Sequence, residues 1–183
     1  HWIKPPRDSH SIPCLAAADG VAVGTIHIQQ REMKDADGDL DRIFSLSEVR
    51  HATDLTHSQL EGFQSRIHGR IEESVSEMFR AHLAILRDKV LMDRIESGIR
   101  AQRPAVAMIR EVYGYHIELL SHSPMERMQE KVQDLQDIAN RLIRNLLGQG
   151  QTSDGLHGRI VVAHALYPSD LLRLVAQDAA GAI

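Results

Sequence analysis

The spacing of apolar residues predicts a block of packed helices through the middle of the chain. The string Ser-Leu-Ser-Glu at residues 45–48 has the form of a capping box and predicts the start of a long helix. A second string of this form, Ser-Val-Ser-Glu at residues 74–77, predicts the start of another. The chain is therefore expected to fold back near residues 69–75.

Three further helices follow from the same spacing. Apolar residues recur three and four apart over residues 91–99, and Pro104 and Pro124 stand where two more helices are expected to begin. Gly148 predicts the end of the last one. Residues 45–148 are thus predicted to form an antiparallel helical bundle.

The segments on either side of this bundle show strand patterns. Residues 14–28 contain short β-branched runs that Gly20 and Gly24 punctuate, with alternation through Val21, Val23, Thr25 and His27. Residues 159–163 form a continuous apolar run of the kind that is buried in parallel sheets. A short helix is expected from Pro168, and Gly181 opens another strand.

This order of elements predicts a mainly α protein in which the helical bundle is inserted into an incomplete α/β domain. Residues 1–13, which contain three prolines, are expected to be a linker. The α/β domain is assigned to residues 14–32 and 156–183, and the helical domain to residues 45–148.

Composition narrows the class of protein. Of the 183 residues, 43% are hydrophobic and 4% aromatic, which favours packed helices over an aromatic-rich sandwich. The net charge of −4 and the lack of a dense basic stripe argue against nucleic acid as a partner. Cys14 is the one cysteine, so no internal disulfide is possible. No apolar run long enough for a membrane span occurs, and we expect a cytoplasmic protein.

Metal binding is not expected. The aspartates of residues 35–41 alternate as in a calcium loop, but Phe44 stands where that loop needs a glutamate. No His-Glu-x-x-His string occurs, and His51 and His57, six residues apart, fall on different faces of a helix.

Four strings, in this order, carry a resemblance to a known family. They are Ala-Ala-Asp-Gly-Val-Ala-Val-Gly at residues 17–24, Met-Phe-Arg-Ala-His-Leu-Ala-Ile-Leu-Arg-Asp at 78–88, Glu-Lys-Val-Gln-Asp-Leu-Gln-Asp-Ile-Ala-Asn-Arg-Leu-Ile at 130–143, and Val-Val-Ala-His-Ala-Leu-Tyr-Pro-Ser-Asp at 161–170. They resemble the front part of Enzyme I, the phosphoenolpyruvate-protein phosphotransferase of the sugar or nitrogen phosphotransferase system. Lys131 and Gln136 stand where the family pattern has basic residues, the first of them an arginine.

The resemblance implies a phosphotransferase that passes a phosphoryl group from phosphoenolpyruvate to a protein histidine and then to an HPr-like carrier. In that family the α/β part is a swivelling phosphohistidine domain, and a C-terminal barrel binds phosphoenolpyruvate and Mg²⁺ and forms the dimer. The accepting histidine lies in a Gly-Gly-x-x-Ser-His segment, which these 183 residues do not contain. We therefore expect this piece alone to hold no catalytic, cofactor or metal residues and to be inactive.

The resemblance also implies a carrier-docking surface on the helices. Its expected members are Glu77, Ala81, Ile85, Asp88, Leu91, Arg110, Tyr115, Leu120 and Lys131. Ile85, Leu91 and Leu120 are expected to form an apolar patch, unless they merely pack the bundle. Lys89 and Val90 replace residues that are often acidic in the family, which implies a different or weaker carrier preference.

Two alternatives stay open. His82 is either a polar partner contact or a hydrogen-bonded histidine of the bundle. The chain as a whole is either the docking part of a phosphotransferase or a non-catalytic helical module, from a degenerate or regulatory homologue, that binds a protein.

Overall fold

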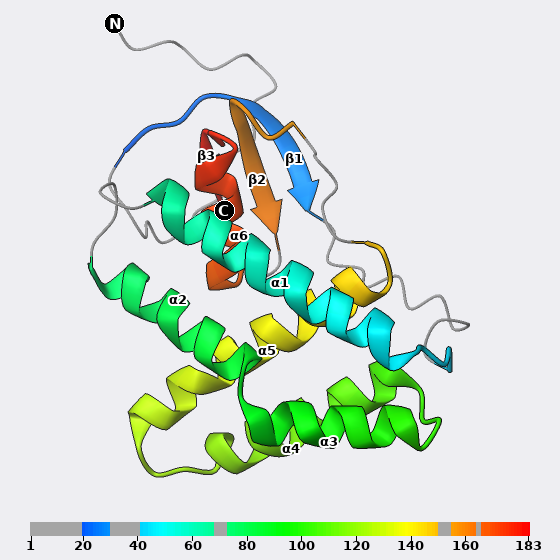
Figure 1. The fold of residues 1–183 in the computed structure, drawn as a ribbon. Helices are drawn as coiled ribbons and strands as arrows, with labels where there is room; N and C mark the ends of the chain where they lie inside the picture. Colours follow the sequence, from blue (N-terminus) through cyan, green and yellow to red (C-terminus); the bar gives the residue numbers. More distant parts are fainter. Residues whose placement is uncertain (1–19, 30–40, 68–72, 150–154, 164–165) are drawn as a thin grey trace, which may run out of the picture.

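The computed structural model describes residues 20–29, 41–67, 73–149, 155–163 and 166–183. Helices dominate this part of the chain, and a small sheet accompanies them, as the sequence predicts (Figure 1). The elements in order are β1 (Thr25–Gln29), α1 (Leu46–Ile67), α2 (Glu73–Leu86), α3 (Lys89–Arg100), α4 (Ala105–Ser121), α5 (Glu126–Leu146), β2 (Arg159–Ala163), α6 (Pro168–Ala176) and β3 (Gly181–Ala182). Cys14 and the aspartates at positions 35, 37 and 39 lie outside the described residues, which resume at Asp41.

The capping box predicted at residues 45–48 is formed. The backbone N–H of Ser45 donates to Oε2 of Glu48 at 2.7 Å, and the N–H of Glu48 donates to Oγ of Ser45 at 3.2 Å. Two N–H groups that the helix itself leaves unbonded are thereby satisfied, so α1 begins where the sequence indicates. The hydrogen bonds from Ser45 lower the pKa of Glu48.

Two predicted helix starts are wrong in detail. Ser74 lies inside α2, which includes Glu73, so the second serine string does not cap that helix. At the last helix, Oγ of Ser123 accepts a hydrogen bond from the N–H of Met125 at 3.3 Å. This local turn delays the helix, and α5 begins at Glu126 rather than directly at Pro124.

Helices α1 to α5, here called the helical unit, share one apolar core. Helix α5 packs on α1, α2 and α4, and α3 packs on α4. The side chains buried most completely in this core are Val49, Leu60, Leu86, Ile95, Val106, Ile109, Tyr113, Ile138 and Leu142. Leu55 of α1 is 38% exposed and lies outside this core.

The three strands and α6, here called the sheet unit, come from the two ends of the described chain. β2 lies between β1 and β3, and both pairings are parallel, with Ile26 opposite Ile160 and Val161 opposite Ala182. The helical unit is therefore inserted in sequence between two neighbouring strands. The strand begins at Thr25, so Val21 and Val23 do not extend it, and both are exposed.

Gly24 allows β1 to approach the turn before β2. A Cβ atom at this position would meet the backbone carbonyl oxygen of Gly158, and neither backbone can move without disturbing the Thr25–Arg159 register. We expect Gly24→Ala to destabilise the sheet unit by about 1–3 kcal/mol through overpacking. Amide hydrogen exchange in β2 measures this effect.

Gly62 provides the matched control for that substitution. It lies in α1, and a Cβ atom there would meet nothing within 4 Å. Because alanine forms helices better than glycine, Gly62→Ala should stabilise the chain by about 1 kcal/mol. Unchanged exchange in β2 of Gly24→Ala would show that this close approach is not needed.

Candidate functional site

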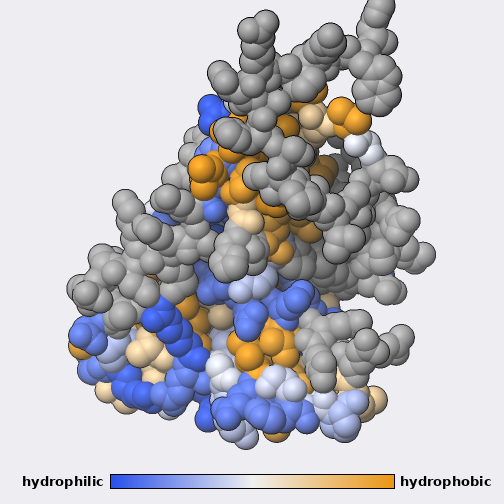
Figure 2. All heavy atoms as spheres, turned by 180° about the vertical axis from the view of Figure 1, so that it is seen from behind, coloured by the Kyte–Doolittle hydropathy of each residue, from blue (hydrophilic) through white to orange (hydrophobic). Residues whose placement is uncertain are grey.

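Large apolar side chains reach the surface along α3, α4 and the start of α5. Those that are clearly exposed are Val90 (62%), Tyr115 (54%), Leu119 (59%), Met125 (58%) and Met128 (38%), and they are called the apolar surface below. Figure 2 shows that apolar residues reach the outside of the helical unit on the face that it displays, with hydrophilic residues around them. Exposed apolar side chains that gather in this way mark interaction sites.

A contact between α3 and α4 links part of this surface. The guanidinium of Arg94 lies over the Tyr115 ring, 5.3 Å from its centroid. Val90 is one helical turn from Arg94, and Leu119 is one turn from Tyr115. The His116 ring meets the Tyr115 ring edge to face, with the centroids 5.3 Å apart. Tyr115 is thus held in place by Arg94 of α3 and His116 of its own helix.

The apolar patch is expected to consist of Ile85, Leu91 and Leu120. These side chains are less exposed than those of the apolar surface. The side chain of Leu91 is only 5% exposed and belongs to the helical core. Ile85 and Leu120 are partly buried and pack against the same core. Packing of the bundle is therefore the main role of Leu91, because it lies on the same face of α3 as the buried Ile95 and Ile99.

Asp88 also stabilises the start of α3. Its Oδ1 accepts hydrogen bonds from the N–H groups of Val90 at 2.8 Å and Leu91 at 3.1 Å, which caps α3. The carboxylate stays exposed at the junction of α2 and α3. Ala81 and Arg110 are half-buried. Glu77 lies in α2, but its side chain is outside the described part.

His82 lies beneath the helical surface rather than on it. Its side chain is fully buried, and Nε2 lies 2.9 Å from Oδ1 of Asp134 on α5. Because a carboxylate only accepts, Nε2 carries the hydrogen and donates it. On the other carboxylate oxygen, Nζ of Lys131 donates to Oδ2 of Asp134 at 2.9 Å. The hydrogen-bonded alternative for His82 is therefore the one that the structure contains.

Asp134 joins α2 to α5 through these two bonds. Burial acts to raise the pKa of its carboxyl group, but the hydrogen bonds from His82 and Lys131 outweigh burial and lower the pKa. The carboxylate is therefore ionised at neutral pH, and Lys131 is engaged within the protein. The Lys131 side chain is 45% exposed, so its amino group pairs with Asp134 at the surface of α5.

Four of the five members of the apolar surface, Val90, Leu119, Met125 and Met128, are not among the residues that the resemblance implies for carrier docking. A signal was present for Leu119, since it lies one turn after Tyr115 on a helix whose other face supplies Val112 and Tyr113 to the core. No comparable signal marks Met125, which precedes α5.

The described residues contain no group of three or more His, Cys, Asp or Glu side chains that could hold a metal ion. Among the helices of this part of the chain, none is both long and apolar enough to cross a membrane.

Comparison with known families and proteins points to one kind of protein. Residues 14–131 match the family described as PEP-utilising enzyme, N-terminal. A phosphoenolpyruvate-protein phosphotransferase of Enterococcus faecalis is 26% identical over 178 residues, which are 91% of this chain and 30% of the relative. One of Haemophilus influenzae is 27% identical over 179 residues, which are 92% of this chain and 31% of the relative. This chain thus spans about 30% of the length of these relatives.

Two solved structures share the fold. The solution structure of an Enzyme I protein (nEIt) superposes with a TM-score of 0.69 at 23% identity, covering 92% of this chain and 71% of the other. The N-terminal domain of a nitrogen Enzyme 1 gives a TM-score of 0.63 at 17% identity, covering 90% and 70%. Their likeness extends over both the helical unit and the sheet unit.

Proposed function

Because the chain belongs to the family of PEP-utilising enzymes, N-terminal, we propose that it is the N-terminal part of a phosphoenolpyruvate-protein phosphotransferase that binds an HPr-like phosphocarrier. The resemblance carried by the four sequence strings is confirmed at the level of the family, and the relatives named above are themselves phosphoenolpyruvate-protein phosphotransferases. Carrier binding is assigned to the apolar surface.

The exposure of Val90, Tyr115 and Leu119 on adjoining helices is the observation that supports this assignment. A helical carrier face can lay its own apolar residues against such a surface, and an aromatic ring with a stacked arginine is a frequent anchor in protein interfaces. Lys89, Asp88 and Arg94 lie at the border and are exposed, so they can select the partner by charge.

The two units have different roles in this proposal. The helical unit is the docking domain, an antiparallel bundle within residues 45–148, and residues 14–32 with 156–183 belong to the phosphohistidine domain into which it is inserted. Carrier residues bound on the helices would be held near that domain, which favours phosphoryl transfer by proximity. Phosphoenolpyruvate, Mg²⁺ and the dimer contact are assigned to other parts of the full-length enzyme, which we place in the cytoplasm.

A helical binding module without phosphotransferase activity is the second candidate. The pairing of Lys131 with Asp134 favours it, because the basic side chain at this position of the family motif already pairs with a carboxylate of its own chain. Phosphoryl transfer from phosphoenolpyruvate to the carrier by the full-length protein separates the two candidates. A carrier that binds but is never phosphorylated would favour the module.

A nitrogen-15 titration tests the docking surface directly. Adding an unlabelled HPr-like carrier from the same organism should shift the amide signals of Val90, Tyr115 and Leu119, because these residues would become buried on binding. Ubiquitin, a small protein unrelated to such carriers, should leave them unchanged. Carrier-induced shifts confined to residues 20–29 would reject the proposed surface.

A further inference from the structure

Arg94 lies at the border of the apolar surface with its guanidinium open to a partner. Its side chain is exposed on α3, and the guanidinium lies over the Tyr115 ring of α4, 5.3 Å from the ring centroid. Among the residues that the structure describes, no carboxylate forms an ion pair or a hydrogen bond with Arg94. This cation is therefore presented to solvent and is not neutralised by a contact within the described chain.

The exposed carboxylates of α3 and α4 do not bind Arg94. Oε2 of Glu111 on α4 accepts a hydrogen bond from Nη2 of Arg103 at 2.5 Å. The hydrogen bond and the charge of Arg103 lower the pKa of Glu111, and the charge of Arg94 adds to this effect, so Glu111 is influenced by Arg94 without pairing with it. Asp93 and Glu118 are also exposed, and neither forms an ion pair with Arg94 in the described part of the chain.

Tyr115 holds the guanidinium ready for a ligand. An aromatic ring attracts a guanidinium to its face and leaves the N–H groups along the guanidinium edge available for hydrogen bonds. Because the stack restricts the long Arg94 side chain, less conformational entropy is lost when a ligand binds. Val90 is one turn from Arg94 and Leu119 is one turn from Tyr115, so exposed apolar groups lie beside these donors. A partner packed there would shield the donors from water and strengthen a hydrogen bond to them.

We propose that Arg94 binds a carboxylate of the partner that covers the apolar surface. The occupant is a helix of an HPr-like carrier with an aspartate or a glutamate among its apolar residues. The planar guanidinium can donate two parallel N–H bonds to the two oxygens of that carboxylate. The apolar residues of the helix would cover Val90, Tyr115 and Leu119. This inference rests on the proposed function and adds the chemical group that the partner must carry.

The same geometry selects against other partners. A helix with a neutral residue opposite Arg94 would remove water from the guanidinium without supplying an acceptor, which costs free energy. A helix with a basic residue at that place would add repulsion between like charges. One carboxylate therefore distinguishes between partner helices that have similar apolar faces.

Replacing Arg94 tests this role with the carrier. Arg94→Met should lower the carrier affinity about 10-fold, because methionine keeps an unbranched apolar stem but donates no hydrogen bond. Arg94→Lys should recover part of the loss and bind about threefold more weakly than the unmodified chain, since an ammonium supplies the charge without the planar pair of donors. Isothermal titration calorimetry measures these affinities.

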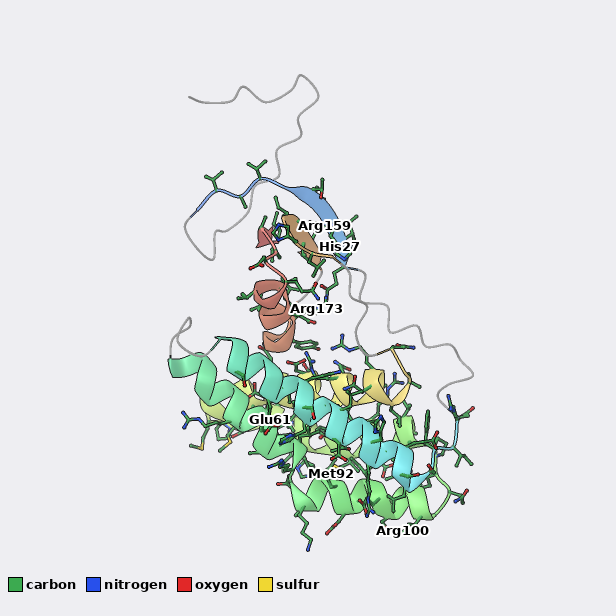
Figure 3. The ribbon with its side chains drawn as sticks, turned by 45° about the horizontal axis from the view of Figure 1, so that its top comes forward. His27, Glu61, Met92, Arg100, Arg159 and Arg173 are labelled. Carbon is green, nitrogen blue, oxygen red and sulfur yellow. The ribbon has the colours of Figure 1, made fainter. Side chains whose placement is uncertain are left out.

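Arg100→Met is the matched control on the same helix. Arg100 is the last residue of α3, and Figure 3 labels it there, with Met92 labelled in the first turn. Nη2 of Arg100 already donates to Oε2 of Glu96 at 2.7 Å, so its guanidinium is engaged within the chain. This control makes the same change in side chain and in net charge as Arg94→Met. It should leave the carrier affinity within about twofold.

Two synthetic amphipathic helices of about 20 residues test the chemistry without the carrier. Both have a leucine face, and they differ at one central position of that face, which is glutamate in one peptide and glutamine in the other. The glutamate peptide should bind the nitrogen-15 labelled chain about 10-fold more tightly. It alone should shift the Nε–Hε signal of Arg94, which would stay unchanged if Arg94 served only to hold the Tyr115 ring.

Equal affinities of the two peptides, or no binding of either, would overturn the assignment of a carboxylate to Arg94. Equal carrier affinities of Arg94→Met and the unmodified chain would also overturn it, and carrier docking on the helices would still stand. A carrier that does not bind the unmodified chain would instead reject the proposed function, and the two peptides would then decide the role of Arg94 by themselves.

Discussion

Replacing Leu119 by aspartate is expected to weaken carrier binding about 30-fold, which corresponds to ~2 kcal/mol, the lower limit for a central interface residue. The side chain is 59% exposed and stands one turn from Tyr115, so on binding the new carboxylate would be buried among apolar groups without a cationic partner. Isothermal titration calorimetry with the carrier measures the change. The chain should stay folded, because position 119 contributes little to the core.

Val175→Asp is the matched control for that substitution. Val175 is also a branched apolar side chain, 51% exposed, but it lies on α6, outside the proposed surface. It should leave the carrier affinity within about twofold. Equal affinity for the carrier in Leu119→Asp and the unmodified chain would exclude α4 from the interface.

Replacing Asp134 by alanine should have the largest effect on stability, with a loss of about 3 kcal/mol in the free energy of unfolding. The substitution leaves Nε2 of the fully buried His82 without its acceptor and removes the link between α2 and α5. Urea unfolding followed by circular dichroism measures the loss. Asp93→Ala, which removes an exposed carboxylate from α3, should change stability by less than ~0.5 kcal/mol.

Lowering the pH should remove the stabilisation that Asp134 gives to the unmodified chain. The pKa of Asp134 is lower in the folded chain than its ordinary value of 3.8, so the folded state binds this proton less readily than the unfolded state. The stabilisation is therefore complete above about pH 4 and is lost as the pH falls through the folded pKa. The stability difference between Asp134→Ala and the unmodified chain should shrink between pH 7 and pH 2. A constant difference would show that Asp134 acts without its charge.

Local hydrogen bonds explain which parts of the fold the sequence predicts well. Ser45 and Glu48 satisfy each other within one turn, so the start of α1 can be read directly. The predictions of strands at residues 159–163 and 181 are also confirmed, because they rest on a short apolar run between turn residues. Ser74 shows the limit, since its string has the same form as that at Ser45 but lies within a helix.

The docking surface as a whole could not be obtained in this way. The spacing of Tyr115 and Leu119 places both on one face of α4, but whether that face meets solvent or a neighbouring helix depends on how α4 packs against α3 and α5. The pairing of His82 with Asp134 joins residues from two helices that are distant in sequence.

The parallel pairing of β1 with β2 also sets the order in which the chain can fold. Residues 30–158 separate the two strands, and closing so long a loop without help costs on the order of 4 kcal/mol in entropy. Contacts within the helical unit are more local, so this unit can form first and bring its two ends together. During synthesis, β1 must then wait until β2 has left the ribosome before the two strands can pair. The backbone N–H and C=O groups of β1 are unpaired in this interval, so the strand edge is open to pairing with other chains.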